Sequence, residues 1–377
     1  MRVLVAPDKF KGTLSAAQAA AAIAAGWRRV RPGDEVVELP LADGGEGTAD
    51  AIVDGLGGER RRVRVSGPLG DPVEAGFGLV HGASGRTAIV EMARASGLAL
   101  VAPERRDPLR ASTRGTGELI RAACAEGPSE VIVALGGSAT TDGGAGMAQA
   151  LGARLIDERG DEIPPGGGGL LELVRIDATG LDPSTRGVRF SAICDVDNPL
   201  TGLQGSAQVF APQKGATPED VVLLDRALAH LAAVIHRDLA IDVRSLPGGG
   251  AAGGLGAGIV AFLGARLRPG IEVVMAAVGF GRELAAADLV VTGEGAFDTT
   301  SLRGKVPGGV LAAAREAGVP VAVVCGRADR RPEGVRVWTL VERYGAERAL
   351  GDARLALEEL AADVAAEVSA DGVSSRP

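Results

Sequence analysis

The stretch VLVAPDKFKGT, residues 3–13, decides the fold, because it joins a short apolar run to a polar loop. Four to five consecutive apolar residues are typical of a buried parallel strand. A capping box of Ser15 and Gln18 then begins a helix whose apolar residues recur at helical spacing as far as Trp27. A second short strand at 36–39 follows after about 30 residues, which is βαβ spacing.

The C-terminal part repeats this pattern. A strand at 288–293 leads into a Gly-rich turn, and Pro307 lies near the first position of the next helix. Strands at 321–325 and 335–341 and a closing amphipathic helix follow. We therefore expect an α/β domain formed by both termini.

The middle of the chain has a different pattern. Residues 61–92 alternate like a meander of strands with tight turns, and mixed helices and strands follow. The sequence thus predicts two domains, one formed by residues 1–66 plus 285–377 and an inserted mixed α+β domain at 67–284. Ligands of open parallel sheets bind at the carboxyl ends of the strands, where we expect the site and a cleft between the domains.

Composition excludes several classes of protein. A net charge of −8 and 3% aromatic residues argue against a nucleic-acid partner. No apolar run reaches the 18 residues of a membrane span, and the three cysteines lie far apart, which suits a reducing cytosol. The 57 glycines, about twice the usual ~7%, cluster at loops where backbone can approach a ligand.

Three loops of the terminal domain carry polar residues after strands, and we expect them to meet at one rim. The first has Asp8, Lys9, Lys11 and Thr13 ahead of a helix, where lysines and free N–H groups suit an anion. The third, residues 292–305, has Glu294, Asp298 and Lys305.

The second of these loops, LADGGEGTA at 41–49, places Asp43 and Glu46 among glycines, including Gly44 and Gly45. Carboxylates repel phosphate, so either a divalent cation or a substrate hydroxyl would lie against them. The alternative is that Asp43 caps the following helix. The loop alone leaves both interpretations open.

The inserted domain has four further candidate segments. The loop 136–146 offers the hydroxyls of Ser138, Thr140 and Thr141 and the carboxylate of Asp142. Asp195 and Asn198 follow the strand near residue 193, and Asp195 is a candidate base or metal ligand.

Lys214, in the segment PQKGA, either faces a phosphate or is an ordinary surface lysine. The run 248–258 contains GxGxxG, but no βαβ unit frames it, so Gly253 and Gly254 indicate a phosphate-contacting loop or close packing.

Several enzyme classes lack their motifs. The chain has no P-loop and no protein-kinase signature, and its three histidines are isolated, which argues against a serine hydrolase or a His-zinc site. Glycine-rich anion loops with lysines and carboxylates fit phosphoryl transfer best.

Taken together, these motifs resemble the type 1 glycerate kinase family over essentially the whole chain. The resemblance rests on long motifs in order, chiefly APDKFKGTLSA, LPLADGGEGTADA, LGGSATTDGGAGMAQALG, CDVDNPLTG and TGEGAFDTTSLRGKVPGGV. It implies a flavodoxin-like domain formed by both termini, and a cytoplasmic transferase that phosphorylates D-glycerate with ATP and Mg²⁺, generally at the 2-hydroxyl. A homodimer is left open.

On this resemblance, we expect Lys11 to take up an anion and Asp195 to act as base or orienting group. Lys214 or Lys305 would stabilise the transferring phosphoryl group. The candidates for Mg²⁺ or substrate hydroxyls are Asp43, Glu294 and Asp298.

Departures from the family pattern put some contacts in doubt, because Thr141 and Thr300 stand where the family has an amide. Lys9, Thr13 and Ala211 also replace usual residues, yet the acids and the lysines 11, 214 and 305 are retained. The alternatives are a kinase for another short hydroxy acid, a non-catalytic regulatory homologue and a nicotinamide dehydrogenase.

Overall fold

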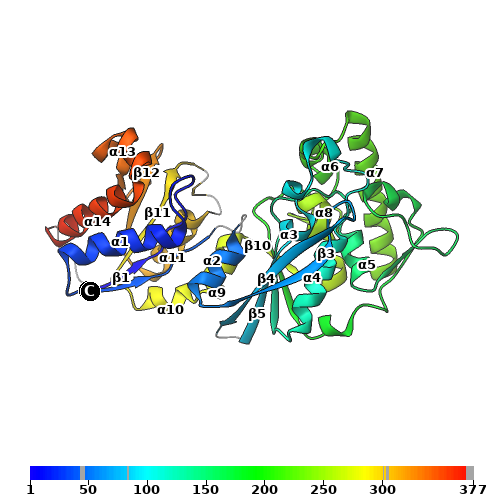
Figure 1. Ribbon diagram of the computed structural model, residues 1–377, viewed down its shortest axis with the longest axis horizontal. Helices are drawn as coiled ribbons and strands as arrows, with labels where there is room; N and C mark the ends of the chain where they lie inside the picture. Colours follow the sequence, from blue (N-terminus) through cyan, green and yellow to red (C-terminus); the bar gives the residue numbers. More distant parts are fainter. Residues whose placement is uncertain (43–46, 83–84, 300, 303–304, 371–377) are drawn as a thin grey trace. The chain divides into compact units, whose positions relative to one another are not determined.

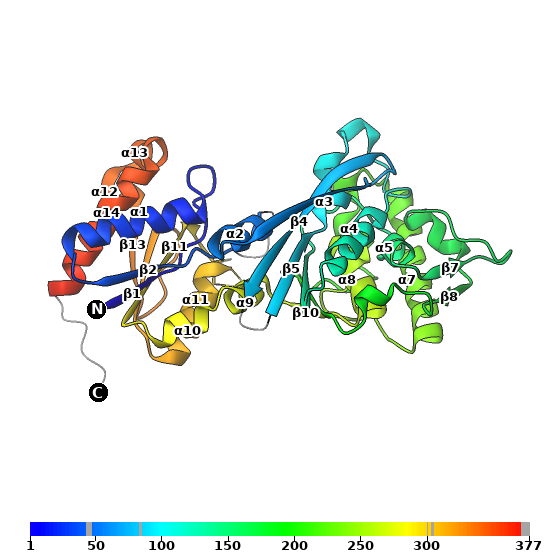
Figure 2. The same cartoon turned by 60° about the horizontal axis from the view of Figure 1, so that its bottom comes forward.

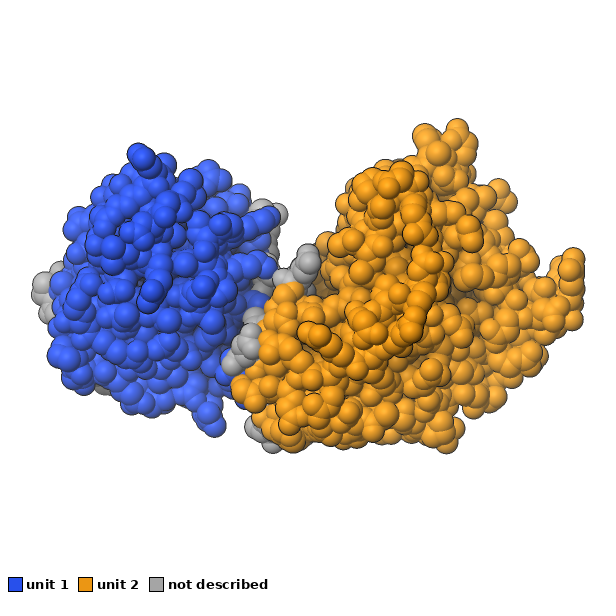
Figure 3. Space-filling model, in the orientation of Figure 1, with its two compact units in different colours: residues 1–43, 54–56, 270–377 blue, residues 44–53, 57–269 orange. Residues whose placement is uncertain are grey.

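The computed structural model describes residues 1–42, 47–82, 85–299, 301–302 and 305–370. The chain forms two compact units, coloured separately in Figure 3. Unit 1 comprises residues 1–43, 54–56 and 270–377, and unit 2 comprises residues 44–53 and 57–269. Within the described residues, none of the helices combines the length and apolarity that crossing a membrane requires.

The compact units divide the chain at 43/44, 53/54, 56/57 and 269/270, whereas the domain boundaries predicted from sequence are 66/67 and 284/285. The first difference arises because residues 59–66 pair with the meander and therefore belong to its sheet. The second arises because the helices between 270 and 285 pack against the helix that begins at Val306. That each unit is a separate domain stays a prediction.

Unit 1 is built on a five-stranded sheet in the order β13-β12-β11-β1-β2, in which every pair is parallel. In chain order within the unit, this places the strands 2-1-3-4-5, which is the flavodoxin-like arrangement and confirms the predicted fold. The strands are β1 (Arg2–Val5), β2 (Glu35–Glu38), β11 (Leu289–Phe297), β12 (Val321–Ala328) and β13 (Arg336–Thr339).

Helices cover both faces of this sheet. α1 (Ala16–Val30) and α14 (Ala353–Ala370) lie side by side on one face, as Figures 1 and 2 show, and bury Val3 and Val5 beneath them. The two helices approach so closely that a Cβ on Gly26 would lie 1.9 Å from the Glu358 carbonyl oxygen. α11 (Val306–Ala317) packs on the other face against Val323 and Phe297. The shorter helices of unit 1 are α9 (Gly270–Ala277), α10 (Phe280–Ala285), α12 (Leu340–Tyr344) and α13 (Ala346–Gly351). α2 (Thr48–Gly55) has residues 48–53 in unit 2 and residues 54–55 in unit 1.

Unit 2 contains a six-stranded sheet in the order β10-β9-β6-β5-β4-β3. The antiparallel pairs β3–β4 and β4–β5 confirm the predicted meander, and β5, β6, β9 and β10 continue in parallel. The strands are β3 (Glu59–Ser66), β4 (Pro72–Gly82), β5 (Gly85–Glu91), β6 (Glu130–Ala134), β9 (Arg189–Ile193) and β10 (Arg266–Arg268), with a separate hairpin of β7 (Arg154–Ile156) and β8 (Arg175–Asp177).

Helices pack on the sheet of unit 2 and enclose its core (Figure 2). Because β6 and β9 are parallel neighbours, the loops that follow them begin side by side at one edge of the sheet. The helices are α3 (Ala93–Ser96), α4 (Arg114–Ala125), α5 (Ala145–Ala150), α6 (Ser206–Phe210), α7 (Pro218–Leu239) and α8 (Ala251–Leu263), and the 3₁₀ turns are η1 (Leu98–Leu100), η2 (Pro103–Arg105), η3 (Gly167–Glu172), η4 (Pro183–Thr185) and η5 (Pro212–Lys214).

Candidate active site

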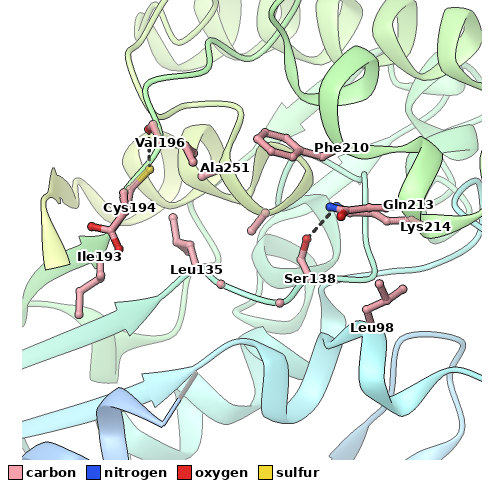
Figure 4. Close-up of a pocket in the computed structure, with 14 residues that line it drawn as sticks. Leu98, Leu135, Ser138, Ile193, Cys194, Val196, Phe210, Gln213, Lys214 and Ala251 are labelled. Atoms are coloured by element: carbon pink, nitrogen blue, oxygen red, sulfur yellow. Dashed lines mark hydrogen bonds between the residues drawn. The ribbon is translucent and has the colours of Figure 1, made fainter. Parts of the chain in front are cut away.

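A cavity of about 350 Å³ lies in unit 2 at the carboxyl ends of β6 and β9 (Figure 4). Apolar side chains form much of its wall, and its polar groups come from three segments: the loop after β6, the loop after β9, and η5. The lining residues that bear on function are Ser138, Cys194, Asp195, Gln213, Lys214 and Ala252.

Lys214 is the cation of this cavity, and its side chain is 2% exposed. Its Nζ donates to Ser138 Oγ at 2.7 Å, the contact drawn in Figure 4, and to the Thr140 carbonyl at 2.6 Å. Both acceptors are neutral, so burial lowers the pKa of Lys214 to about 7, while the charge of Asp142 acts in the opposite direction. Of the two interpretations of PQKGA, the ordinary surface lysine is therefore wrong.

Asp142 is fully buried behind the same loop. Its carboxylate accepts from the backbone N–H and the hydroxyl of Thr113, at 2.8 and 2.9 Å, and from Ser112 Oγ at 3.3 Å. The backbone N–H groups of Gly144 and Gly146 donate to it at 3.1 and 3.2 Å. Burial raises the pKa of Asp142 above its ordinary value, and these five donors act against that rise because they favour the ionised carboxylate. The carboxylate thus joins the starts of α4 and α5 to the loop 136–146.

The Gly-rich run 248–258 packs against this loop. A Cβ on Gly253 would lie 1.8 Å from the Thr140 carbonyl oxygen, and Gly143 N donates to the Gly253 carbonyl at 3.0 Å. Gly253 and Gly254 both have positive φ, as does Ala252 at 52°. Of the two interpretations kept open for this run, close packing is the one these contacts support.

Asp195 lines the cavity just beyond the end of β9 and is exposed. The neighbouring Cys194 is half-buried, its Sγ donates to the Val196 carbonyl at 3.0 Å, and burial raises its pKa. Asn198 uses its amide to donate to the Gln204 carbonyl at 2.8 Å, which holds the loop together. Asp195, Ser138 and Lys214 thus line one cavity. Asn198 is not among the lining residues, and its amide bonds within the loop instead.

The candidate residues of the first loop lie in unit 1. Asp8 is 4% exposed, and its backbone N–H donates to the Gly293 carbonyl of β11 at 2.8 Å. Lys9 and Lys11 are exposed, and Thr13 donates its hydroxyl to the Phe10 carbonyl at 3.0 Å. The sheet order places the ends of β2, β1 and β11 next to one another, as the predicted common rim requires.

The third loop begins later than expected. β11 continues through Glu294 and Gly295 to Phe297, so the predicted turn after residue 293 is wrong. The glycines accommodate close neighbouring backbone instead, because a Cβ on Gly293 would lie 1.7 Å from the Val324 carbonyl oxygen. Asp298 Oδ1 accepts from Ser301 N at 3.1 Å in the turn that follows.

Lys305 precedes α11 as its N-terminal cap residue. Asp43, Gly44, Gly45 and Thr300 lie outside the described residues.

Mg²⁺ prefers one or two carboxylates together with substrate oxygens and water. Among the described residues, no group of three or more His, Cys, Asp or Glu side chains is arranged to hold a metal ion. Asp8 and Glu294 are both buried; Asp8 follows the end of β1, and Glu294 lies within the adjacent strand β11, three residues before its last residue. Such a pair of carboxylates fits the donor set of Mg²⁺.

Sequence reasoning gave no role to Ser112, Thr113 and Gln213. Ser112 and Thr113 donate hydrogen bonds to Asp142, which lies 30 and 29 residues later in the chain. Only the fold reveals these contacts. Gln213 lines the cavity beside Lys214. The segment STRGTGELI at 112–120 places two hydroxyls ahead of a helix, but nothing in it identifies the acid that they bind.

Comparisons with known proteins agree on one family. A family model described as the glycerate kinase family matches residues 3–369. A glycerate kinase of Halalkalibacterium halodurans is 51% identical over 88% of this chain and 87% of its own length. A glycerate 2-kinase of Escherichia coli is 48% identical over 86% of this chain and 85% of its own length. A crystal structure from Salmonella typhimurium LT2, of a protein assigned as glycerate kinase 2, superposes with a TM-score of 0.90 at 47% identity, covering 98% of this chain and 99% of that one.

Proposed function

The chain belongs to the glycerate kinase family, and on that premise we propose that it phosphorylates D-glycerate with ATP, giving phosphoglycerate and ADP. The 2-hydroxyl is the proposed acceptor, because the Escherichia coli relative is named a glycerate 2-kinase. The reaction forms a bond between the acceptor hydroxyl oxygen and the γ-phosphorus. It breaks the bond from the γ-phosphorus to the bridging oxygen of ADP.

The buried Lys214 is the observation that carries this proposal. An ammonium group has three N–H donors, and two of them bond to neutral acceptors in the protein. A buried cation without an acidic hydrogen-bond partner among the described residues is unfavourable until an anion reaches it. The third N–H is available to a carboxylate or phosphoryl oxygen in the cavity, where both substrates are anions.

Asp195, on the same cavity, is the proposed partner of the acceptor hydroxyl. It would accept the hydroxyl proton as the new oxygen–phosphorus bond forms. Because the transition state is loose, orientation of the hydroxyl is the larger part of its role. Ser138, fixed by Lys214, is a proposed substrate-binding hydroxyl.

The proposed cation is Mg²⁺, with Asp8 and Glu294 as ligands from the described residues and Asp43 and Asp298 as further candidates. When bound, Mg²⁺ neutralises phosphate charge during transfer. Lys9, Lys11, Thr13 and Lys305 are the proposed anion-binding side chains of unit 1, and Lys11 and Lys305 are the two lysines retained from the family pattern. A reducing cytoplasm is the proposed compartment, because all three cysteines are free thiols.

The test is an ADP-release assay with ATP and Mg²⁺ and, in turn, D-glycerate, L-glycerate, glycolate or no acceptor. We expect rapid ADP release with D-glycerate only. Rapid release with another acid and none with D-glycerate would move the proposal to a different hydroxy acid. In the same assay, Asp195→Asn should lower kcat by about 10²-fold, the usual contribution of a general base. A near-normal kcat would remove Asp195 from this role.

A further inference from the structure

The loop 136–146 carries Ser138 and the carbonyl that binds Lys214, and two buried charges hold it in place. The hydroxyls of Thr140 and Thr141 are buried and have no hydrogen-bond partner among the described residues. The side-chain contacts that fix the loop are therefore those of Lys214 on the cavity side and Asp142 on the side of α4 and α5.

The site of Asp142 is built for a carboxylate. Thr113 Oγ1 accepts from Met147 N at 2.9 Å, and Ser112 Oγ accepts from Arg114 N at 3.2 Å. Each hydroxyl is thereby oriented to give its own proton to Asp142. The other three donors to Asp142 are backbone N–H groups. A carboxylate can accept all five of these hydrogen bonds, so the site favours the ionised form of Asp142.

Besides Lys214, two titratable groups are among the described residues that line the cavity. Asp195 and the Cys194 thiol face the same cavity from the end of β9. Arg106, on the segment after η2, donates to the Gln213 carbonyl at 3.2 Å and carries a like charge. Asp142 is the acid whose charge opposes the effect of burial on the Lys214 ammonium.

We propose that Asp142 is a positioning residue of the phosphoryl-transfer reaction, which fixes the loop that binds Lys214 and supplies the negative charge that keeps Lys214 cationic in the cavity. This inference rests on the proposed function, because it needs a reaction that uses Lys214 as a cation. It concerns a residue that need not contact either substrate.

The experiment measures kcat/KM for D-glycerate between pH 5.5 and 9, which reports ionisations of the free enzyme. The variants are Asp142→Asn, which removes the charge, and Ser112→Ala, which removes one hydrogen bond to Asp142 and keeps the charge. Lys214→Arg is the third variant, because a guanidinium stays protonated throughout this range.

The wild type should lose kcat/KM as the pH rises through about 7, where the Lys214 ammonium loses its proton. Asp142→Asn should move this fall to lower pH. A shift of one unit would reduce the ammonium fraction about tenfold at pH 8 relative to the wild type. Ser112→Ala should keep the wild-type pH dependence, and the fall should vanish in Lys214→Arg.

A pH-independent loss shared by Asp142→Asn and Ser112→Ala would reduce Asp142 to a structural residue and overturn the proposal, as would a wild-type profile in Asp142→Asn. Should Asp142→Asn not fold, ¹³C NMR of the aspartate carboxyl groups in the wild type and Ser112→Ala decides instead. An Asp142 carboxylate that stays ionised from pH 5.5 to 9 supports the proposal, and an Asp142 carboxyl group that is protonated over this range overturns it. Absence of any turnover by the folded wild type would instead refute the proposed function.

Discussion

Replacing Lys214 by methionine should change how the stability of unit 2 depends on pH. The folded protein holds this ammonium with a pKa of about 7, against an ordinary value of 10.5. Between these values the unfolded chain binds the proton and the folded chain releases it, so the free energy of unfolding rises with pH. Below about pH 7 both states hold the proton, and the penalty for burying the cation is complete and constant.

The size of the effect follows from this difference. Between pH 7 and 9, release of the proton by the folded state should raise the free energy of unfolding of the wild type by about 2 kcal/mol, at 1.36 kcal/mol per pKa unit. Lys214→Met carries no charge in either state and should lack this increment. The wild type should therefore gain about 2 kcal/mol over Lys214→Met across that interval.

The assay is urea unfolding of both proteins at pH 7 and pH 9. Both tryptophans, Trp27 and Trp338, belong to unit 1, so tryptophan fluorescence follows that unit. Far-UV circular dichroism is needed to follow unit 2 as well, and comparison of the two signals isolates its transition. Lys11→Met, at an exposed lysine of unit 1, controls for the loss of one positive charge. An equal pH dependence of the free energy of unfolding in the wild type and Lys214→Met would refute the claim that burial lowers the pKa of Lys214.

Three further results are expected. Gly253→Ala should destabilise unit 2 by more than the about 1–2 kcal/mol of a left-handed residue, because its Cβ would lie 1.8 Å from a carbonyl oxygen. In chemical unfolding, the control Gly264→Ala, with φ of 63° and nothing within 4 Å, should cost only that strain. Gly26→Ala should lower the free energy of unfolding of unit 1, measured by fluorescence, although alanine favours a helix over glycine by about 1 kcal/mol. A higher free energy of unfolding would contradict the close approach of α1 and α14. A thiol reagent should label Cys194 first in the native protein, since burial raises the pKa of the other two cysteines to about 11 and about 12; rapid labelling of all three would contradict this.

Local signals in the sequence predicted the framework of unit 1. The capping box of Ser15 and Gln18 begins α1 as expected, and Pro307 lies in the first turn of α11. The strands between these signals are short apolar runs. Such runs predict a parallel sheet, because its strands are buried on both faces. The extension of β11 through Glu294 was missed because glycines indicate a turn as readily as close contact with a neighbouring strand.

The candidate site was predictable only in part. Asp195 and Ser138 follow strands, and that position alone marked them as candidates. The burial of Lys214 depends on the loop after β6, which lies more than 70 residues earlier, as the separations of 76 and 74 residues show. The role of Asp142 likewise depends on partners about 30 residues away, and no local pattern encodes such contacts.

The most direct test is ³¹P NMR of the purified protein incubated with ATP, Mg²⁺ and D-glycerate. We predict that the γ-phosphate signal of ATP is replaced by those of ADP and 2-phosphoglycerate in equal amounts, and that omission of D-glycerate leaves ATP intact. A 3-phosphoglycerate signal would contradict the assigned hydroxyl, and unchanged ATP in the presence of D-glycerate would contradict glycerate phosphorylation itself.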